Sequence, residues 1–475
     1  MEVEEYLRSY PIDGVVLLAN CDKSVPGSLM GAISTDLPTI MFTAGARPVA
    51  EFRGKPIGTG TDLWRMWSDY RAKKISEETW KEFEGCLNCG LGSCNTMGTA
   101  SSVAMMVEAL GLTLPGTSVI PENNPARKVA AFNSGREIVK MVNNEVIPSK
   151  ILTPAAFRNA MRVLHACGGS TNAIIHLLAI SGRIDGGLTI GAINELGTGL
   201  AVIADVEPSG AKLIQDFNQA GGLPALIANC GENFELDERT LIGKSWREIV
   251  KDVSPTNKTI RKLDDPIYPS AAFAVVKGNL APNGAVIKVS AASKELLSHT
   301  GPAVVFHGYA DMRSRIDEPS LNITKDSVLV LRDCGPVGVP GMPEWGMIPV
   351  PKKLIEAGVT DMVRISDARM SGTSFGTCVL HISPESAVGG PLALVKDGDQ
   401  IKLDVSSGSL ELLVDNGEIE KRKLNWQAPV SEHLRGWPAL YQAHVMQADL
   451  GCDLDFLRPK SKIERKFVPP VVGRS

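Results

Sequence analysis

The 475-residue sequence lacks the features that identify several classes of protein. No apolar run approaches the roughly 18 residues that a membrane-spanning helix needs. The first ten residues, MEVEEYLRSY, lack the charged-then-apolar pattern of a secretion signal. The formal net charge is −4 with lysine and arginine dispersed, so no basic block indicates binding to nucleic acid or to a membrane surface. We therefore expect a cytoplasmic protein, and these patterns do not separate it from a mitochondrial one.

Nucleotide-binding motifs are also missing. The sequence has no Gly-x-Gly-x-x-Gly after a strand-like run and no P-loop, which disfavours nucleotide-dependent enzymes. Internal repeats and low-complexity segments are absent as well. With 44% hydrophobic and 21% charged residues, the chain has the composition and length of a folded protein of two or three domains.

Nine cysteines are present without a secretion signal, which argues against a disulfide framework because the cytosol keeps thiols reduced. We expect some of them to be core residues. Cys86, Cys89 and Cys94 stand out because glycines between them allow the backbone to approach an inorganic centre closely. An iron–sulfur cluster and a structural zinc are the two interpretations, and the lack of a second cysteine pair or a nearby histidine disfavours zinc.

Alternating strand-like and helical patterns predict a parallel α/β sheet in the first part of the chain. The runs 14–19 and 37–42 are strand candidates, and Asn20-Cys21-Asp22-Lys23-Ser24 follows the first of them directly. Ligands bind at the carboxyl ends of strands in open α/β sheets. A thiolate beside a carboxylate suits iron through sulfur and Mg²⁺ through oxygen. The alternative is a half-buried cysteine next to a surface Asp–Lys pair.

Helices are expected from Thr153 to Gly168, from Ser170 to Gly182, and after Cys94. Short strand-like runs take over near residue 278, with turns expected at 282–284, 396–398 and 415–417. The sequence therefore predicts an α/β domain over residues 1–277 and a β-rich, barrel-like domain over residues 278–475. The strand-like runs of the second domain are 285–289, 303–306, 328–331, 401–405 and 410–414.

Two further segments of the predicted second domain carry polar groups. Gly335–Glu344 is a glycine- and proline-rich loop that ends in a carboxylate. Ser366–Thr373 places Ser371 between an arginine and a glycine, after an apolar run. Considered alone, each segment is equally well explained as a solvated turn.

Taken together, these motifs resemble the dihydroxy-acid dehydratase and phosphogluconate dehydratase superfamily. The resemblance extends over nearly the whole chain, and several details resemble the sugar-acid branch, such as the arabinonate and xylonate dehydratases. The stretches that carry it are Asn20–Ser24, Phe52–Lys55, Gly58–Asp62, Cys94–Ser101, Gly168–Ala173, Gly341–Glu344, Ser366–Gly372 and His444–Asp449.

The resemblance implies a role for each matching residue. Cys21 and Cys94 would hold a [2Fe-2S] cluster, with [4Fe-4S] as the alternative. Asp22, Glu344 and a carbamylated Lys23 would bind Mg²⁺, and Ser371 would be the catalytic base. The resemblance further implies substrate contacts by four residues: Ser170, Thr171, Arg369 and His444.

The activity implied is that of a hydro-lyase that dehydrates a sugar acid to its 2-keto-3-deoxy product, in a homo-oligomer such as a dimer or tetramer. The alternative of the same class is dihydroxy-acid dehydratase of branched-chain amino-acid synthesis. An inactive or regulatory paralogue, and a zinc or redox protein built on the three clustered cysteines, are alternatives of other classes.

The start of the sequence departs from the family pattern. The family has an N-terminal segment with a further cluster cysteine and a further Mg²⁺-binding aspartate, whereas no cysteine precedes Cys21 here and Asp13 does not match. We therefore expect the chain as written to be an incomplete form with little dehydratase activity, unless Cys86 or Cys89 replaces the missing ligand.

Overall fold

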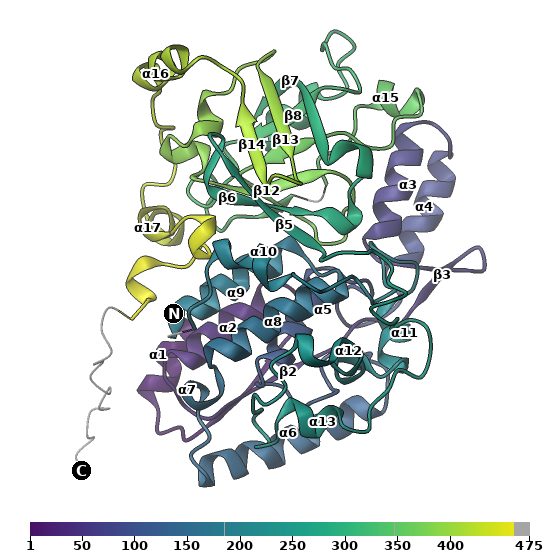
Figure 1. Ribbon diagram of the computed structural model, residues 1–475, viewed down its shortest axis with the longest axis vertical. Coiled ribbons are helices and arrows are strands. Elements are labelled where there is room, and N and C mark those ends of the chain that lie inside the picture. Colours follow the sequence, from purple (N-terminus) through teal and green to yellow (C-terminus); the bar gives the residue numbers. More distant parts are fainter. Residues whose placement is uncertain (185, 346, 460–475) are drawn as a thin grey trace.

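The computed structural model describes residues 1–184, 186–345 and 347–459 of the chain. Figure 1 shows a helical part built from residues 1–272 and, above it, a β-barrel part built from residues 273–459. The predicted architecture, a parallel-sheet α/β region followed by a barrel-like region, is confirmed. The division at residue 277 stays a prediction, and the first strand of the barrel begins at Phe273.

The predicted parallel strands are β1 (Val15–Ala19) and β2 (Thr39–Thr43). They pair in parallel with Val15 opposite Thr39 and Ala19 opposite Thr43, so the two carboxyl ends meet at one edge. Within the described residues this sheet has two strands, and helices α2 (Ser24–Ile33) and α6 (Ala126–Asn143) pack against it. The loop after β1 therefore starts at the sheet edge and runs directly into α2.

Three central helices form the core of the helical part. Every residue of α5 (Thr99–Ala109) is buried, and α8 (Pro154–Cys167) and α9 (Thr171–Arg183) pack against it. The expected caps are present: Thr153 accepts a hydrogen bond from the Ala156 N–H, and Ser170 accepts one from the Asn172 N–H. Helix α8 ends at Cys167, directly before Gly168, as predicted, whereas α9 runs one residue past the expected stop at Gly182.

The remaining helices of the helical part surround this core, and two short strands form a hairpin. Their bounds are α1 (Glu2–Ser9), β3 (Ala50–Phe52), β4 (Lys55–Ile57), α3 (Thr61–Arg71), α4 (Glu77–Cys86), α7 (Pro148–Ile151), α10 (Ile193–Leu196), α11 (Ile214–Gln219), α12 (Gly222–Cys230) and α13 (Trp246–Val250). Helices α3 and α4 leave the helical part and lie beside the barrel (Figure 1).

Eight strands close the barrel in the order β10-β12-β6-β5-β14-β13-β7-β8. Its interior is filled by branched apolar side chains such as Val276, Ile287, Val330 and Ile401, all buried. The strands are β5 (Phe273–Gly278), β6 (Ala281–Lys288), β7 (Ser298–His307), β8 (Val328–Arg332), β10 (Arg364–Ser366), β12 (Cys378–Ser383), β13 (Gln400–Asp404) and β14 (Ser409–Leu412). Helices α14 (Gly308–Arg315), α15 (Lys352–Glu356), α16 (Asn416–Asn425) and α17 (Gly436–His444) flank them.

Two turns were predicted wrongly. Residues 282–284 lie inside β6, where Gly284 adopts a φ of +115° and pairs with Ser383 of β12. Asp415 is the N-cap of α16, because its carboxylate accepts a hydrogen bond from the Gly417 N–H. Both segments contain the Asn-Gly pair that suggested a turn. In residues 282–284 this pair belongs to a bulged strand, and in residues 415–417 it belongs to the first turn of a helix.

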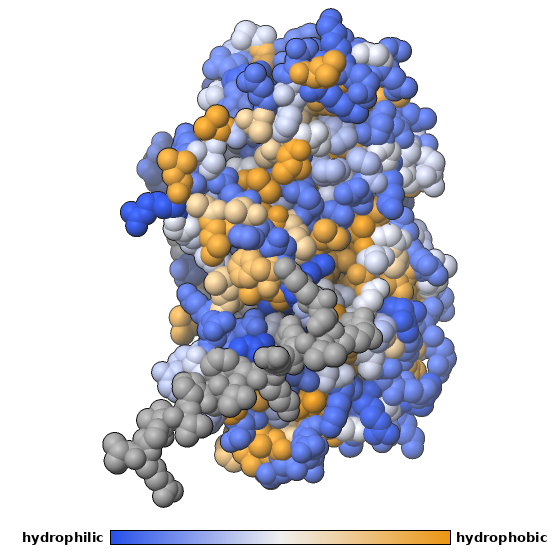
Figure 2. All heavy atoms as spheres, turned by 90° about the vertical axis from the view of Figure 1, so that its left-hand side faces the viewer, coloured by the Kyte–Doolittle hydropathy of each residue, from blue (hydrophilic) through white to orange (hydrophobic). Residues whose placement is uncertain are grey.

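The C-terminal segment returns from the barrel to the helical part. Asp453 forms a buried bidentate ion pair with Arg183 of α9, with N–O distances of 2.5 and 2.8 Å. Figure 2 shows the face that carries α17, where apolar side chains gather between the two parts. Val430, Leu434 and Trp437 are strongly exposed in this segment. Among the described residues, no helix combines the length and apolar character that crossing a membrane requires.

Candidate active site

The loop after β1 places three predicted site residues in succession. Cys21 has a φ of +72°, a left-handed conformation that residues other than glycine seldom adopt. The strained turn ends as Ser24 starts α2 and donates its hydroxyl to the Asn20 carbonyl. The Cys21 thiol lies 3.6 Å from Asp22 Oδ1. The sheet edge and the helix start therefore fix the directions of Cys21, Asp22 and Lys23.

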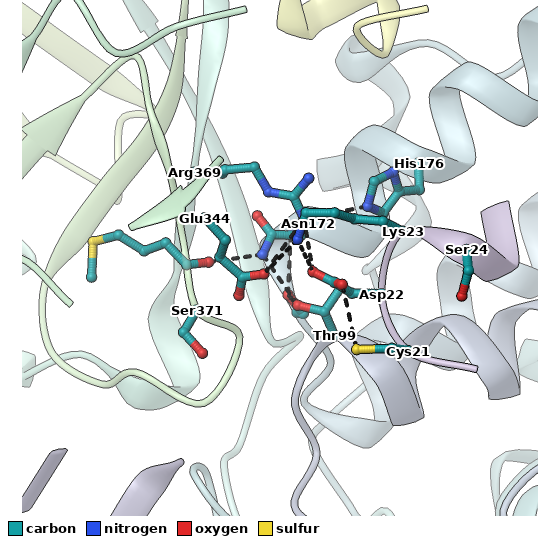
Figure 3. A network of polar contacts seen from close by, with 12 residues as sticks. Cys21, Asp22, Lys23, Ser24, Thr99, Asn172, His176, Glu344, Arg369 and Ser371 are labelled. Carbon is teal, nitrogen blue, oxygen red and sulfur yellow. Dashed lines mark hydrogen bonds and ion pairs between the residues drawn. The ribbon is translucent and has the colours of Figure 1, made fainter. Parts of the chain in front are cut away.

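Two residues of the barrel part complete a charged cluster with this loop (Figure 3). Lys23 Nζ lies 2.8 Å from Asp22 Oδ2 and 3.4 Å from Glu344 Oε2. Arg369 Nη2 lies 3.2 Å from Asp22 Oδ2 and 3.7 Å from Glu344 Oε2. Glu344 and Arg369 face each other because their short strands β9 (Glu344–Trp345) and β11 (Arg369–Met370) pair in parallel. The fold thus joins residues more than 300 positions apart.

The two carboxyl groups of this cluster are electrostatically coupled. Burial alone would raise the pKa of Asp22, but hydrogen bonds with Glu344 and Lys23 and the charge of Arg369 lower it below its ordinary value. Burial, followed by the hydrogen bond with Asp22, raises the pKa of Glu344 to about 7. Two carboxylates this close disfavour simultaneous ionisation unless a cation lies between them. Here the Lys23 ammonium contacts both.

Glu385 forms hydrogen bonds with the loop 335–344, which ends at Glu344. Its carboxylate accepts backbone hydrogen bonds from Val337 at 2.8 Å and Gly338 at 2.9 Å, and one from the side chain of Gln447 at 2.9 Å. Burial raises the pKa of Glu385 to about 7. No local pattern marks this residue in the sequence, since its partners lie 47 to 62 positions away.

Cys94 belongs to the same electrostatic neighbourhood. Burial raises the pKa of its thiol, the nearby Arg47 charge opposes this, and the charges of Glu344 and Asp22 raise it further. A charge on Cys94 likewise raises the pKa of Cys21, whose own burial is the larger cause. The charges of Cys21 and Cys94 therefore interact with each other and with the carboxylate pair, although the two residues are 73 positions apart in sequence.

The other two clustered cysteines lie differently. Cys86 ends α4, and the exposed Cys89 thiol donates a hydrogen bond to the Pro48 carbonyl at 3.2 Å. In the part of the chain that the structure describes, no group of three or more His, Cys, Asp or Glu side chains is placed to hold a metal ion. Substitution of a family ligand by Cys86 or Cys89 stays a prediction.

Ser371 lies in the loop after β11. The next residue, Gly372, allows that loop to pack closely against the helical part. A Cβ atom on Gly372 would lie 2.6 Å from Ser170 Oγ and 2.7 Å from the Thr99 backbone nitrogen. Only glycine fits at this distance. The starts of α5 and α9 therefore support the loop, and Asn172 of α9 donates to the Met370 carbonyl at 2.7 Å.

The four predicted substrate contacts lie in different surroundings. Arg369 is in the charged cluster, whereas Ser170 and Thr171 are buried beside the Ser371 loop and line a cavity of about 20 Å³ with it. The His444 ring pairs with Asp455 at 3.0 Å, and no described contact joins it to the cluster. All four roles stay predictions.

A second serine in the loop has the spacing of a hydrolase nucleophile. Gly372-Thr-Ser374-Phe-Gly376 matches the Gly-x-Ser-x-Gly pattern. The Ser374 hydroxyl, however, donates to the Ser371 carbonyl at 2.6 Å. Its described hydrogen bond therefore closes the turn and does not connect it to a histidine base.

The comparisons with known proteins agree with this arrangement. Residues 1–249 match the N-terminal region, and residues 258–452 the C-terminal region, of the dihydroxy-acid/6-phosphogluconate dehydratases. The chain is 45% identical to a 6-deoxy-6-sulfo-D-gluconate dehydratase of Pseudomonas putida, covering 99% of this chain and 82% of the relative. It is 45% identical to an L-arabinonate dehydratase of Rhizobium leguminosarum bv. trifolii (strain WSM2304), covering 96% and 80%. It is 35% identical to a dihydroxy-acid dehydratase of Methanobrevibacter smithii (strain ATCC 35061), covering 95% and 82%.

The family match and these relatives show that the chain is a dehydratase, that is, a hydro-lyase. The chain belongs to the dihydroxy-acid/6-phosphogluconate dehydratase family.

Proposed function

We propose that this dehydratase removes water from a sugar acid of the aldonate class and yields the 2-keto-3-deoxy acid. The observation that carries the proposal is the cluster of Asp22 and Lys23 with Glu344 and Arg369 across the two parts of the fold. The carboxylates of this cluster can bind a hard cation, and the guanidinium of Arg369 can attract an anionic substrate. Relatives that act on sugar acids share 45% of their residues with this chain, against 35% for the dihydroxy-acid dehydratase.

The donor set fits the groups that the family resemblance implies. Asp22, Glu344 and a carbamylated Lys23 would hold Mg²⁺, because carboxylate oxygens are the ligands this ion prefers. Cys21 and Cys94 would hold an iron–sulfur cluster. The Lys23 ammonium already bridges the two carboxylates, so positive charge is accommodated between them. When bound, the metal centres supply Lewis-acid chemistry for a substrate carboxylate and its hydroxyl groups.

The side chains of this dehydratase account for binding and proton transfer. The Arg369 guanidinium attracts the substrate carboxylate into the cluster. Ser371 Oγ, in its deprotonated form, takes the proton from C2 of the substrate. The C3–O bond then breaks and the 3-hydroxyl leaves as water with the proton that Ser371 Oγ returns, so the base is regenerated. The resulting enol tautomerises to the 2-keto acid. Gly372 packs against the starts of α5 and α9 and so fixes the position of the neighbouring Ser371.

A substrate panel tests the proposal. The protein produced from its natural gene is reconstituted anaerobically with iron, sulfide and Mg²⁺. It is then assayed for 2-keto acid formation from L-arabinonate, D-xylonate, D-gluconate, 6-deoxy-6-sulfo-D-gluconate and 2,3-dihydroxyisovalerate. We expect kcat/KM for at least one sugar acid to exceed that for 2,3-dihydroxyisovalerate by at least about tenfold. The reverse preference would assign the protein to branched-chain amino-acid synthesis.

A further inference from the structure

Thr373, two residues after Ser371, is enclosed by the helical part. A Cβ atom on Gly60 would lie 2.6 Å from Thr373 Cβ, and one on Gly98 would lie 2.8 Å from Thr373 Cγ2. The Thr61 hydroxyl donates to the Thr373 carbonyl at 3.2 Å. Thr373 is therefore held by contacts on several sides, and its side chain has a fixed orientation relative to α3.

Trp64 of α3 determines the direction of the Thr373 hydroxyl. Its indole Nε1 lies 3.1 Å from Thr373 Oγ1, and an indole N–H can only donate. Thr373 Oγ1 therefore accepts from Trp64, and its own proton is available for Ser371 Oγ at 2.8 Å. The Thr373 backbone N–H also points to Ser371 Oγ, at 3.3 Å.

Two donors thus converge on the Ser371 oxygen. Hydrogen bonds to the charged form of an acid favour that form. A chain of donors, each polarised by the previous one, is stronger than its separate bonds. The Ser374 hydroxyl does not compete, because it donates to the carbonyl of Ser371.

We infer that Trp64 is a positioning residue that orients the Thr373 hydroxyl toward Ser371 and so stabilises the deprotonated serine. The inference rests on the proposed role of Ser371 as the base. The structure places the donor on α3, a helix that the sequence gives no reason to connect with Ser371, 307 positions further along the chain.

The test compares Trp64→Phe with Trp67→Phe in the protein from its natural gene, reconstituted with iron, sulfide and Mg²⁺. Trp67 is on the same helix but packs against Tyr70 and Trp80, so it is a matched control. We expect Trp64→Phe to lower kcat for the best sugar acid about two- to tenfold, the range for a hydrogen bond between neutral groups, because the lost bond is the one to the Thr373 hydroxyl. KM should change less than about twofold, and the rise of kcat with pH should shift to higher pH.

Two further variants separate positioning from a structural effect. Replacing Trp64 with 3-benzothienyl-alanine keeps the ring shape and removes only the N–H, so it should behave like Trp64→Phe even if phenylalanine disturbs folding. Adding Thr373→Val to Trp64→Phe should cost less than the sum of the single changes, because both break one chain. Kinetics like those of Trp67→Phe, or a change confined to KM, would overturn the inference. Activity in Ser371→Ala would instead overturn the proposed function.

Discussion

The buried ammonium of Lys288, at the end of β6, predicts a stability that depends on pH. In the part of the chain that the structure describes, its Nζ has no hydrogen-bond partner. Burial lowers the pKa of Lys288 from its ordinary 10.5 to about 8, and a charge on Cys167 opposes this. The Cys167 thiol, raised to a pKa of about 12 by burial, stays neutral in this range. The difference for Lys288 corresponds to about 3 kcal/mol.

The sign follows from proton binding in the two states. Below about pH 8 the lysine is charged in both states, so the folded protein bears the full cost of burying the charge. Between pH 8 and 10.5 the unfolded chain still binds the proton that the folded protein has released, so stability rises with pH. Above 10.5 both states are neutral and the cost disappears.

Lys288→Met keeps the length of the side chain and removes the charge. We expect it to raise the free energy of unfolding by about 3 kcal/mol at pH 7 and by less than about 1 kcal/mol at pH 10. Urea unfolding curves at both values measure this, with the exposed Lys277→Met of β5 as the control that shows neither gain. A gain that is independent of pH, or a loss of stability at pH 7, would refute the reasoning.

The remaining predictions concern the C-terminal ion pair, the cluster ligands and the assembly. Asp453→Asn removes the bidentate carboxylate partner of the buried Arg183 guanidinium but leaves it the longer ion pair with Glu4 at 3.6 Å, and should lower the free energy of unfolding by about 3 kcal/mol, whereas the exposed Asp455→Asn should change it by less than about 0.5 kcal/mol in the same urea titration. Cys94→Ser should lose iron after reconstitution while Cys89→Ser retains it, and equal iron by elemental analysis would contradict the ligand assignment. Light scattering should give a mass at least twice the 50.8 kDa of one chain, and a monomer would contradict the homo-oligomer prediction.

The local parts of the fold could be predicted from the sequence. Apolar runs followed by polar loops gave β1 and β2, and capping residues gave both ends of α8. Strands β5, β10 and β12 were not predicted; every residue of β10 and β12 is buried, and strands buried on both faces lose the alternation that marks a strand. The turn expected at 282–284 was wrong because pairing across the barrel overrides local turn preference.

The candidate site was predictable only in its motifs. The Asp22 and Glu344 segments could each be singled out by residue type, and the family resemblance connected them. Glu385 and Trp64 were missed because their partners are 47 and 309 positions away and no local pattern announces the contact. Such residues are found from the packing of one part of the fold on the other.

The most direct measurement of the central claim is the turnover of Ser371→Ala with the best sugar acid, after reconstitution of the protein from its natural gene. Ser374→Ala in the same loop is the matched control. Because the change removes a base and no metal ligand, iron and Mg²⁺ content should equal that of the unmodified protein. We predict that kcat falls at least about a hundredfold in Ser371→Ala and less than about threefold in Ser374→Ala. Turnover of Ser371→Ala within tenfold of the unmodified protein, at equal metal content, would contradict the account.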